Sequence, residues 1–151
     1  MDELLLGEYE CRRDDRGRLR LPAEIVNRHA EDDGNFVLRK GLDNCLVLYP
    51  VSSWKRESGR VNQLDDLVPK ERKFKRMFFL TSKAVKLDGN KRIQIPGFLS
   101  ERAGIERDVV ILGVGDRYEI WDKAEHVRET GDLDQINELA SDIFGSRNEA
   151  A

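Results

Sequence analysis

The sequence has few of the residues that build disulfide frameworks, metal sites or nucleophilic catalytic sites. It contains two cysteines and two histidines in 151 residues. Cys11 and Cys45 lack metal-site spacing, and we interpret them as free thiols, with one disulfide as the alternative. His29 and His126 lie in different segments, without a nearby nucleophile pattern, and we interpret them as isolated surface residues. The sequence therefore predicts no enzyme, no metal and no cofactor.

Long apolar runs are also missing. No segment approaches the roughly 18 consecutive apolar residues that a membrane span needs, and residues 1–7 lack the basic start and apolar run of a signal peptide. Gly113 and Gly115 follow an apolar stretch, as in a dinucleotide-binding loop, but the third glycine is absent and another strand follows. We therefore expect a soluble, cytoplasmic protein with no membrane contact and no small-molecule substrate.

The charges are unevenly distributed along the chain. Residues 122–151 carry eight acidic and three basic side chains, so 1–121 is net positive although the whole chain is −3. Basic side chains crowd residues 12–20, and again residues 70–76. Local field rather than total charge governs binding to a polyanion, so the acidic total does not exclude one. For residues 70–76 a solvated helix face is the preferred interpretation, with a second DNA contact as the alternative.

One short signature occurs twice. Asp14–Pro22 and Asp88–Pro96 share Asp-x-x-x-Arg, an alternating apolar stretch and a proline. Such self-similarity indicates a duplicated half-module. Because a half of about 75 residues is marginal as an independent core, the two halves should pack together.

The patterns between and after the signatures predict the secondary structure. Each signature should form a strand with its basic residues on one face, followed by a short helix that begins at the proline. Further strands are expected at 36–38, 45–49, 109–115 and 117–121. Residues 52–80 should form two helices, the first capped by Ser52 or Ser53, with the apolar run 77–80 in the core. An amphipathic helix is expected over 133–144, with 145–151 frayed.

These segments resemble the MraZ transcriptional regulators, which carry two AbrB-type swapped-hairpin modules in one chain. The resemblance spans about residues 4–145. The matching segments are Gly7–Glu10, Asp14–Pro22, Gly41–Pro50 with Trp54, Asp88–Pro96 and Val109–Trp121.

The resemblance implies a mainly β fold with helices (α+β). In it, two AbrB-like swapped-hairpin halves form a double-split β-barrel with linking and C-terminal helices. The expected division is 7–53 for the first half, 54–82 for a helical linker, 83–126 for the second half and 127–151 for the amphipathic helix and tail. It also implies a ring-like homo-oligomer that binds double-stranded DNA and is associated with the nucleoid. The implied function is repression of the division and cell-wall gene cluster, through short direct repeats upstream of the protein's own gene.

The resemblance assigns the DNA-facing surface to the two Asp-x-x-x-Arg turns. The carried-over residues are Asp14 with Arg18 and Asp88 with Arg92. An aspartate at the base of such a turn can orient the guanidinium, and arginine's fork can grip phosphates or read guanine edges. We hypothesise that nearby basic residues add phosphate and base contacts, namely Arg13, Arg16, Arg20 and Lys91.

The second copy departs from the usual pattern at one position. Lys91 stands where the family has glycine, and Gly89 lies earlier in the turn. The pattern therefore defines the turn geometry, and so the aim of Arg92, less clearly than that of Arg18, and we expect the first copy to be the stronger contact.

Two other functions fit the same chain. An antitoxin-like module would bind a toxin protein and repress its own operon, although such proteins usually have one AbrB half and a disordered tail. A scaffold would oligomerise without binding nucleic acid. Binding to a fragment of the protein's own upstream region separates the scaffold from the regulator.

Overall fold

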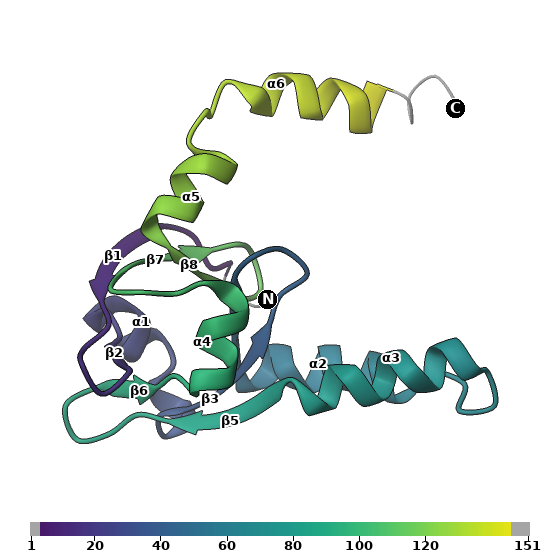
Figure 1. Cartoon of the computed structure of the whole chain (residues 1–151), viewed down its shortest axis with the longest axis horizontal. Coiled ribbons are helices and arrows are strands. Elements are labelled where there is room, and N and C mark those ends of the chain that lie inside the picture. Colours follow the sequence, from purple (N-terminus) through teal and green to yellow (C-terminus); the bar gives the residue numbers. More distant parts are fainter. Residues whose placement is uncertain (1–3, 146–151) are drawn as a thin grey trace.

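The computed structural model describes residues 4–145, and its elements run in two similar series (Figure 1). The first series is β1 (Glu8–Arg12), β2 (Arg18–Arg20), α1 (Ala23–Arg28), η1 (Ala30–Asp32), β3 (Asn35–Lys40) and β4 (Leu46–Pro50). The second is β5 (Ser82–Lys86), β6 (Arg92–Gln94), α4 (Gly97–Ala103), β7 (Asp108–Gly113) and β8 (Tyr118–Asp122). Between them lie α2 (Val51–Asn62) and α3 (Pro69–Leu80). After them come α5 (Lys123–Thr130), α6 (Gln135–Ala140) and the π-helical turn η2 (Ser141–Gly145).

The two series exchange strands. The main sheet has six strands in the order β1-β7-β8-β4-β3-β5, and every pairing is antiparallel. Each half therefore lends its first strand to the hairpin of the other half, β1 to β7 and β5 to β3. This confirms the α+β class and the swapped hairpins. Within residues 4–145 the strands do not close into a complete barrel.

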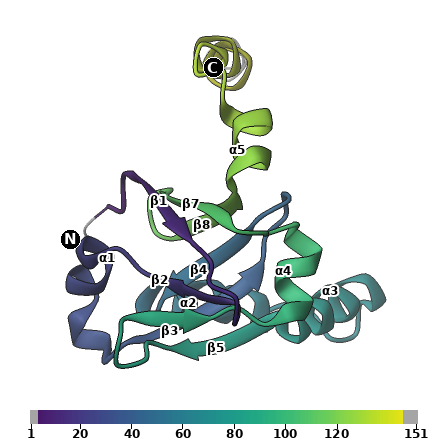
Figure 2. The same cartoon turned by 60° about the vertical axis from the view of Figure 1, so that its left-hand side comes forward.

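A separate two-stranded ribbon joins the two signatures. β2 and β6 are antiparallel, with Leu19 opposite Ile93, Arg18 opposite Gln94 and Arg20 opposite Arg92. Leu19 and Ile93 are equivalent residues of the two copies, so the local two-fold axis passes between them. Figure 2 shows the ribbon lying across the strands of the main sheet.

The alternation in each signature explains what the ribbon buries. Leu19 and Ile93 are fully buried, while Arg20 and Gln94 on the opposite face are exposed. Because side chains alternate across a strand, one face of the ribbon covers the core and the other presents polar groups. The core beneath it takes side chains from both halves, including those of α1, α4, β3 and β7.

The helical linker packs against the sheet through a few aromatic side chains. Trp54 of α2 stacks on Phe78 of α3, with ring centroids 5.5 Å apart. The guanidinium of the buried Arg39 lies 4.6 Å from the centre of the Phe78 ring and donates to the Tyr49 hydroxyl (3.0 Å). These contacts fix α3 to the sheet, and the α2–α3 hairpin projects beyond it (Figure 1).

Two expectations for the linker were wrong. The first concerned the start of α2. This helix begins at Val51 after Pro50, and Ser53 does not cap it, because its hydroxyl donates to the Asp116 carbonyl. The second placed the whole apolar run 77–80 in the core. Only Phe78 is buried; Met77, Phe79 and Leu80 are exposed in the single chain.

The helix expected over 133–144 is present as α6 followed directly by η2. The sequence prediction left out α5, which comes before it and is separated from it by a short turn (Figure 1). The apolar side chains of α6 are exposed rather than packed. Of the residues expected to be frayed, 146–151 lie outside the described range. No helix between residues 4 and 145 is long and apolar enough to span a bilayer.

Both thiols are free, as predicted. Cys45 is buried and Cys11 is half-buried, and burial raises the pKa of the Cys11 thiol to about 11. Burial also raises the pKa of Cys45, to about 12. Both groups are therefore protonated near neutral pH, which fits packing roles rather than nucleophilic ones.

Leu19→Ala should lower the free energy of unfolding by about 2–4 kcal/mol, because it opens a cavity at the joint between the halves. Ile93→Ala, its symmetry equivalent, should cost a similar amount. Urea denaturation followed by circular dichroism measures both. Arg20→Ala, on the exposed face of the same strand, is the control, with an expected change within about 0.5 kcal/mol. Losses as small as the control at Leu19 and Ile93 would contradict this account of the ribbon.

Candidate nucleic-acid interface

The first signature forms a tight turn organised by one aspartate. Asp14 Oδ1 accepts hydrogen bonds from the backbone N–H of Arg16 (3.0 Å) and of Arg18 (2.8 Å). Asp14 Oδ2 accepts from Arg18 Nε (2.8 Å). The carboxylate therefore fixes both the backbone of the turn and the direction of the arginine.

The second signature reproduces the same turn. Asp88 Oδ1 accepts from the backbone N–H of Asn90 (2.8 Å) and of Arg92 (3.0 Å), and Oδ2 accepts from Arg92 Nε (2.9 Å). Equivalent atoms are thus used in both copies. Arg92 is therefore held by the same bonds as Arg18, although the sequence pattern defined its turn less clearly.

The glycine and the lysine of the two turns share one backbone conformation. Gly17 has φ +78° and Lys91 has φ +62°, both in the left-handed region. At Gly17 a side chain would also be crowded, since a Cβ would lie 3.0 Å from Gln94 Nε2 and 3.2 Å from a guanidinium nitrogen of Arg13. Lys91 is exposed and meets no such obstacle. The departure from the family pattern therefore keeps the turn, at the cost of local backbone strain.

Each turn is also tied to the other half. The carbonyl of Gly17 accepts from Ile95 N–H and that of Lys91 accepts from Leu21 N–H, both at 3.0 Å. A guanidinium nitrogen of Arg92 lies 3.9 Å from Asp14 Oδ2. These bonds fix the two turns relative to one another at opposite ends of the ribbon.

The carboxylates of both turns have lowered pKa values. For Asp14 the largest cause is the hydrogen bond from the Arg18 backbone N–H, and for Asp88 it is that from the Arg92 backbone N–H. Further hydrogen bonds and the charge of each arginine act in the same direction. The two aspartates are therefore ionised at neutral pH and orient the arginines as ion-pair partners.

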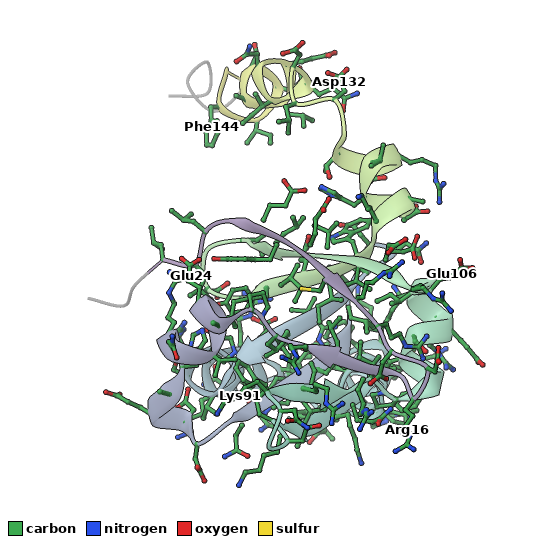
Figure 3. All side chains as sticks on the ribbon, turned by 90° about the vertical axis from the view of Figure 1, so that its left-hand side faces the viewer. Arg16, Glu24, Lys91, Glu106, Asp132 and Phe144 are labelled. Carbon is green, nitrogen blue, oxygen red and sulfur yellow. The ribbon has the colours of Figure 1, made fainter. Side chains whose placement is uncertain are left out.

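Most of the predicted residues gather on the ribbon face. Arg16, Arg20 and Lys91 are exposed, whereas Arg18 and Arg92 are half-buried. Figure 3 shows Arg16 and Lys91 on the side of the molecule opposite Asp132 and Phe144. The acidic segment 132–144 therefore does not cover the basic turns of its own chain.

Arg13 is placed differently from the other predicted contacts. Its guanidinium donates to the Ile105 carbonyl (3.2 Å) and to Ser100 Oγ (3.3 Å), both in the second half. Arg13 therefore links the two halves through hydrogen bonds, and its contact with DNA stays a prediction.

The sequence prediction left out Gln94. It is exposed, lies opposite Arg18 in the ribbon, and donates from Nε2 to the Arg16 carbonyl (2.8 Å). The alternation that places Arg92 on the outer face also places Gln94 there, so a signal existed. An amide at this position adds a group that can hydrogen-bond a base edge.

The expectation that both histidines are isolated surface residues was wrong. His29 Nε2 lies 2.8 Å from the Tyr118 hydroxyl, and its ring packs edge-on against Phe36. His126 Nε2 lies 3.2 Å from Glu8 Oε1. Both are structural, and residues 4–145 hold no group of three or more potential metal ligands of the His, Cys, Asp and Glu types.

Tandem halves that exchange strands around a pseudo-two-fold axis define a class of single-chain, duplicated swapped-hairpin proteins. Comparison with known proteins agrees with this duplication. The family described as "MraZ protein, putative antitoxin-like" matches twice, over residues 4–77 and 78–137. The chain belongs to the MraZ family.

Several curated relatives carry the name "Transcriptional regulator MraZ". The protein from Cytophaga hutchinsonii is 40% identical over 116 residues, which cover 76% of this chain and 77% of the relative. The protein from Moorella thermoacetica is 40% identical over 133 residues, 85% of this chain and 90% of the relative. The protein from Heliobacterium modesticaldum is 39% identical over 120 residues, 80% and 82% of the two chains.

Lys91→Gly should raise the free energy of unfolding by about 0.5–1 kcal/mol, because it relieves the left-handed strain that a side chain causes there. Urea denaturation measures the change. Lys91→Ala, which removes the same charge but keeps a Cβ, should give no such gain. Equal gains in the two variants would indicate a charge effect instead.

Asp14→Asn should reduce the loss of stability at acid pH. A carboxylate whose pKa is lowered by folding stabilises the native state above its unfolded value, near 3.9, and this contribution disappears as pH falls through the lower folded value. Thermal melting of wild type and variant from pH 7 down to about 2, well below the unfolded value, checks this. Asp15→Asn, at an exposed carboxylate in the same turn, is the control. A wild-type loss of stability below pH 4, about the unfolded value, that Asp14→Asn leaves unchanged would contradict this role of Asp14.

Proposed function

We propose that this protein is a transcriptional regulator that binds double-stranded DNA through the outer face of the β2–β6 ribbon. The observation that carries the proposal is the pair of identical Asp-x-x-x-Arg turns fixed on one face. Membership of a family whose relatives are named transcriptional regulators supports it.

The chemistry of the turns fits a nucleic-acid contact. Arg18 and Arg92 are each held through Nε by an aspartate. Each guanidinium therefore loses little conformational freedom when its remaining N–H groups bind phosphate or guanine. Arg16, Arg20 and Lys91 surround them as exposed cations and supply charge for the phosphate backbone.

The specific regulatory role is a further part of the proposal. The protein represses the division and cell-wall gene cluster by binding short direct repeats upstream of its own gene. It does so as a ring-like homo-oligomer, because one ribbon offers a small contact surface and several linked ribbons on spaced repeats gain avidity. It works in the cytoplasm, associated with the nucleoid, and has no catalytic activity.

The antitoxin-like alternative has one specific observation in its favour, the family description that contains this word. In that case a small partner protein would bind the chain with defined stoichiometry and alter its DNA affinity. The duplicated ribbon favours the DNA-binding regulator, since both halves are used in building one surface.

Arg18→Ala should weaken binding to a DNA fragment from the protein's own upstream region by about 5- to 150-fold, the effect of one lost base or phosphate contact. The slope of log affinity against log salt should also fall in magnitude by about 1 if the contact is to phosphate. Gel shifts with scrambled competitor DNA measure both.

Arg128→Ala is the matched control for this experiment. Arg128 is exposed on α5 and pairs with Glu125, and α5 lies on the other side of the molecule from the basic turns (Figure 3). This variant loses the same charge and should bind as wild type does. An Arg18→Ala variant that also binds like wild type at low salt would overturn the proposed interface.

A further inference from the structure

The outer face of the β2–β6 ribbon carries two rows of side chains that differ in chemistry. In the first row Arg18 lies opposite Gln94, and in the second row Arg20 lies opposite Arg92. The local two-fold axis relates Arg18 to Arg92, so this pair is matched. The same axis relates Arg20 to Gln94, because both stand two residues before the proline of their signature. At that position one half therefore has a cation and the other half has a neutral amide.

The amide of Gln94 is fixed by the turn beside it. Its Nε2 donates to the Arg16 carbonyl (2.8 Å). Gly17 leaves room for this contact, since a Cβ there would lie 3.0 Å from Gln94 Nε2. The bond uses one of the two N–H groups of Nε2, and no donor in residues 4–145 bonds to Oε1. The held amide therefore offers one acceptor and one donor to a ligand.

An acceptor beside a donor matches the edge that adenine presents in the major groove. Adenine offers N6–H as a donor and N7 as an acceptor, and glutamine can bind both at once. Arginine has donors but no acceptor, so Arg18, Arg20 and Arg92 suit guanine or phosphate instead. The major groove is also wide enough to admit a two-stranded β-ribbon. Of the four outward side chains of the ribbon, Gln94 is thus the one suited to adenine.

The second row favours an acceptor with negative charge. Arg20 and Arg92 are cations directly opposite one another on neighbouring strands, an arrangement that is unfavourable without a counter-charge. Asp88 pairs with Arg92, whereas Arg20 forms no ion pair within residues 4–145. A phosphate or the acceptor edge of guanine relieves this repulsion.

A second amide lies in the other turn but is not held. Asn90 occupies the place that Arg16 has in the first turn, and its side chain makes no hydrogen bond within the described part of the chain. Ordering a free side chain on binding costs conformational entropy, which Gln94 has already lost in the fold. Asn90 therefore serves as the comparison for Gln94.

We propose that Gln94 reads an adenine in the major groove of the operator, while Arg20 at the symmetry-related position contacts guanine or phosphate. This inference rests on the DNA-binding function proposed above. The difference between the two residues gives the pseudo-symmetric ribbon one preferred orientation on DNA. Turning a repeat round would place its adenine under Arg20, so such a protein selects repeats that run in one direction.

A base-substitution scan tests the role of Gln94. Fluorescence anisotropy measures the affinity of the full-length protein for its upstream DNA, shortened to the smallest fragment that binds and changed one base pair at a time. Wild type should prefer adenine at one position, where another base weakens binding by about 5- to 150-fold. Gln94→Ala should abolish that preference alone and keep the salt dependence, because no charge is lost.

Asn90→Ala is the matched control for this scan and should keep every wild-type preference. Thermal melting should show that Gln94→Ala is folded, since the side chain is exposed. An adenine preference that survives in Gln94→Ala would overturn the proposal. A uniform loss of affinity for all fragments would also overturn it, because it would assign Gln94 a structural role in the turn.

A second variant tests the orientation. Arg20→Gln with Lys91→Gly rebuilds the second row as a copy of the first. This variant should prefer an adenine at both ends of the site, on opposite strands, so its best sequence becomes an inverted repeat. Arg20→Ala with Lys91→Gly loses the same charges without adding an amide and should gain no second adenine. Equal base preferences in the two variants would contradict the role of the amide.

Arg18→Ala separates a failure of this inference from a failure of the proposed function. If Arg18→Ala weakens binding while Gln94→Ala leaves the adenine preference unchanged, the DNA-binding function stands and the role of Gln94 is wrong. If wild type does not distinguish its upstream DNA from scrambled DNA, both are wrong.

Discussion

The pairing of β2 with β6 is the constraint on which the rest of the structure depends. It brings Leu19 and Ile93 together on the local two-fold axis and closes the core over side chains from both halves. The same pairing carries Leu21 N–H to the Lys91 carbonyl and Ile95 N–H to the Gly17 carbonyl. A half on its own has neither this ribbon nor a complete sheet, because its hairpin pairs with the first strand of the other half. Each half therefore needs a second half to complete its fold, and in this chain the tandem copy supplies it.

The surface chemistry follows from this constraint. Inward leucine and isoleucine require outward residues at the alternate positions, and these are arginines and one glutamine. An aspartate four residues before each strand then sets the turn and the arginine together. One carboxylate therefore both holds the backbone of the turn and orients the arginine for binding. This is why Lys91 can replace glycine without disturbing Arg92, since the bonds to Asp88 hold the turn in place.

Much of this could be predicted from the sequence, because the relevant signals are local or repeated. The constant spacing of the two signatures predicts the duplication, and the alternation of apolar and polar residues predicts the two faces of the ribbon. The Asp-x-x-x-Arg spacing predicts the ion pairs. Contacts between residues far apart in the sequence have no such local pattern. Nothing near Arg13 indicates that its guanidinium reaches Ser100 and Ile105. The apolar run that contains Met77 and Leu80 also has the composition of a core segment. That composition is the same whether the segment packs within its own chain or against a second one.

The central claim is that both copies of the signature face the same DNA. Covalent labelling of arginine and lysine, followed by mass spectrometry with and without the upstream DNA fragment, tests it most directly. The exposed probes are Arg16 and Arg20 in the first turn region, Lys91 in the second, and Arg128 as the remote reference. We expect DNA to protect Arg16, Arg20 and Lys91 and to leave Arg128 reactive. Protection confined to one copy, or found on α3 instead of the ribbon, would contradict the account.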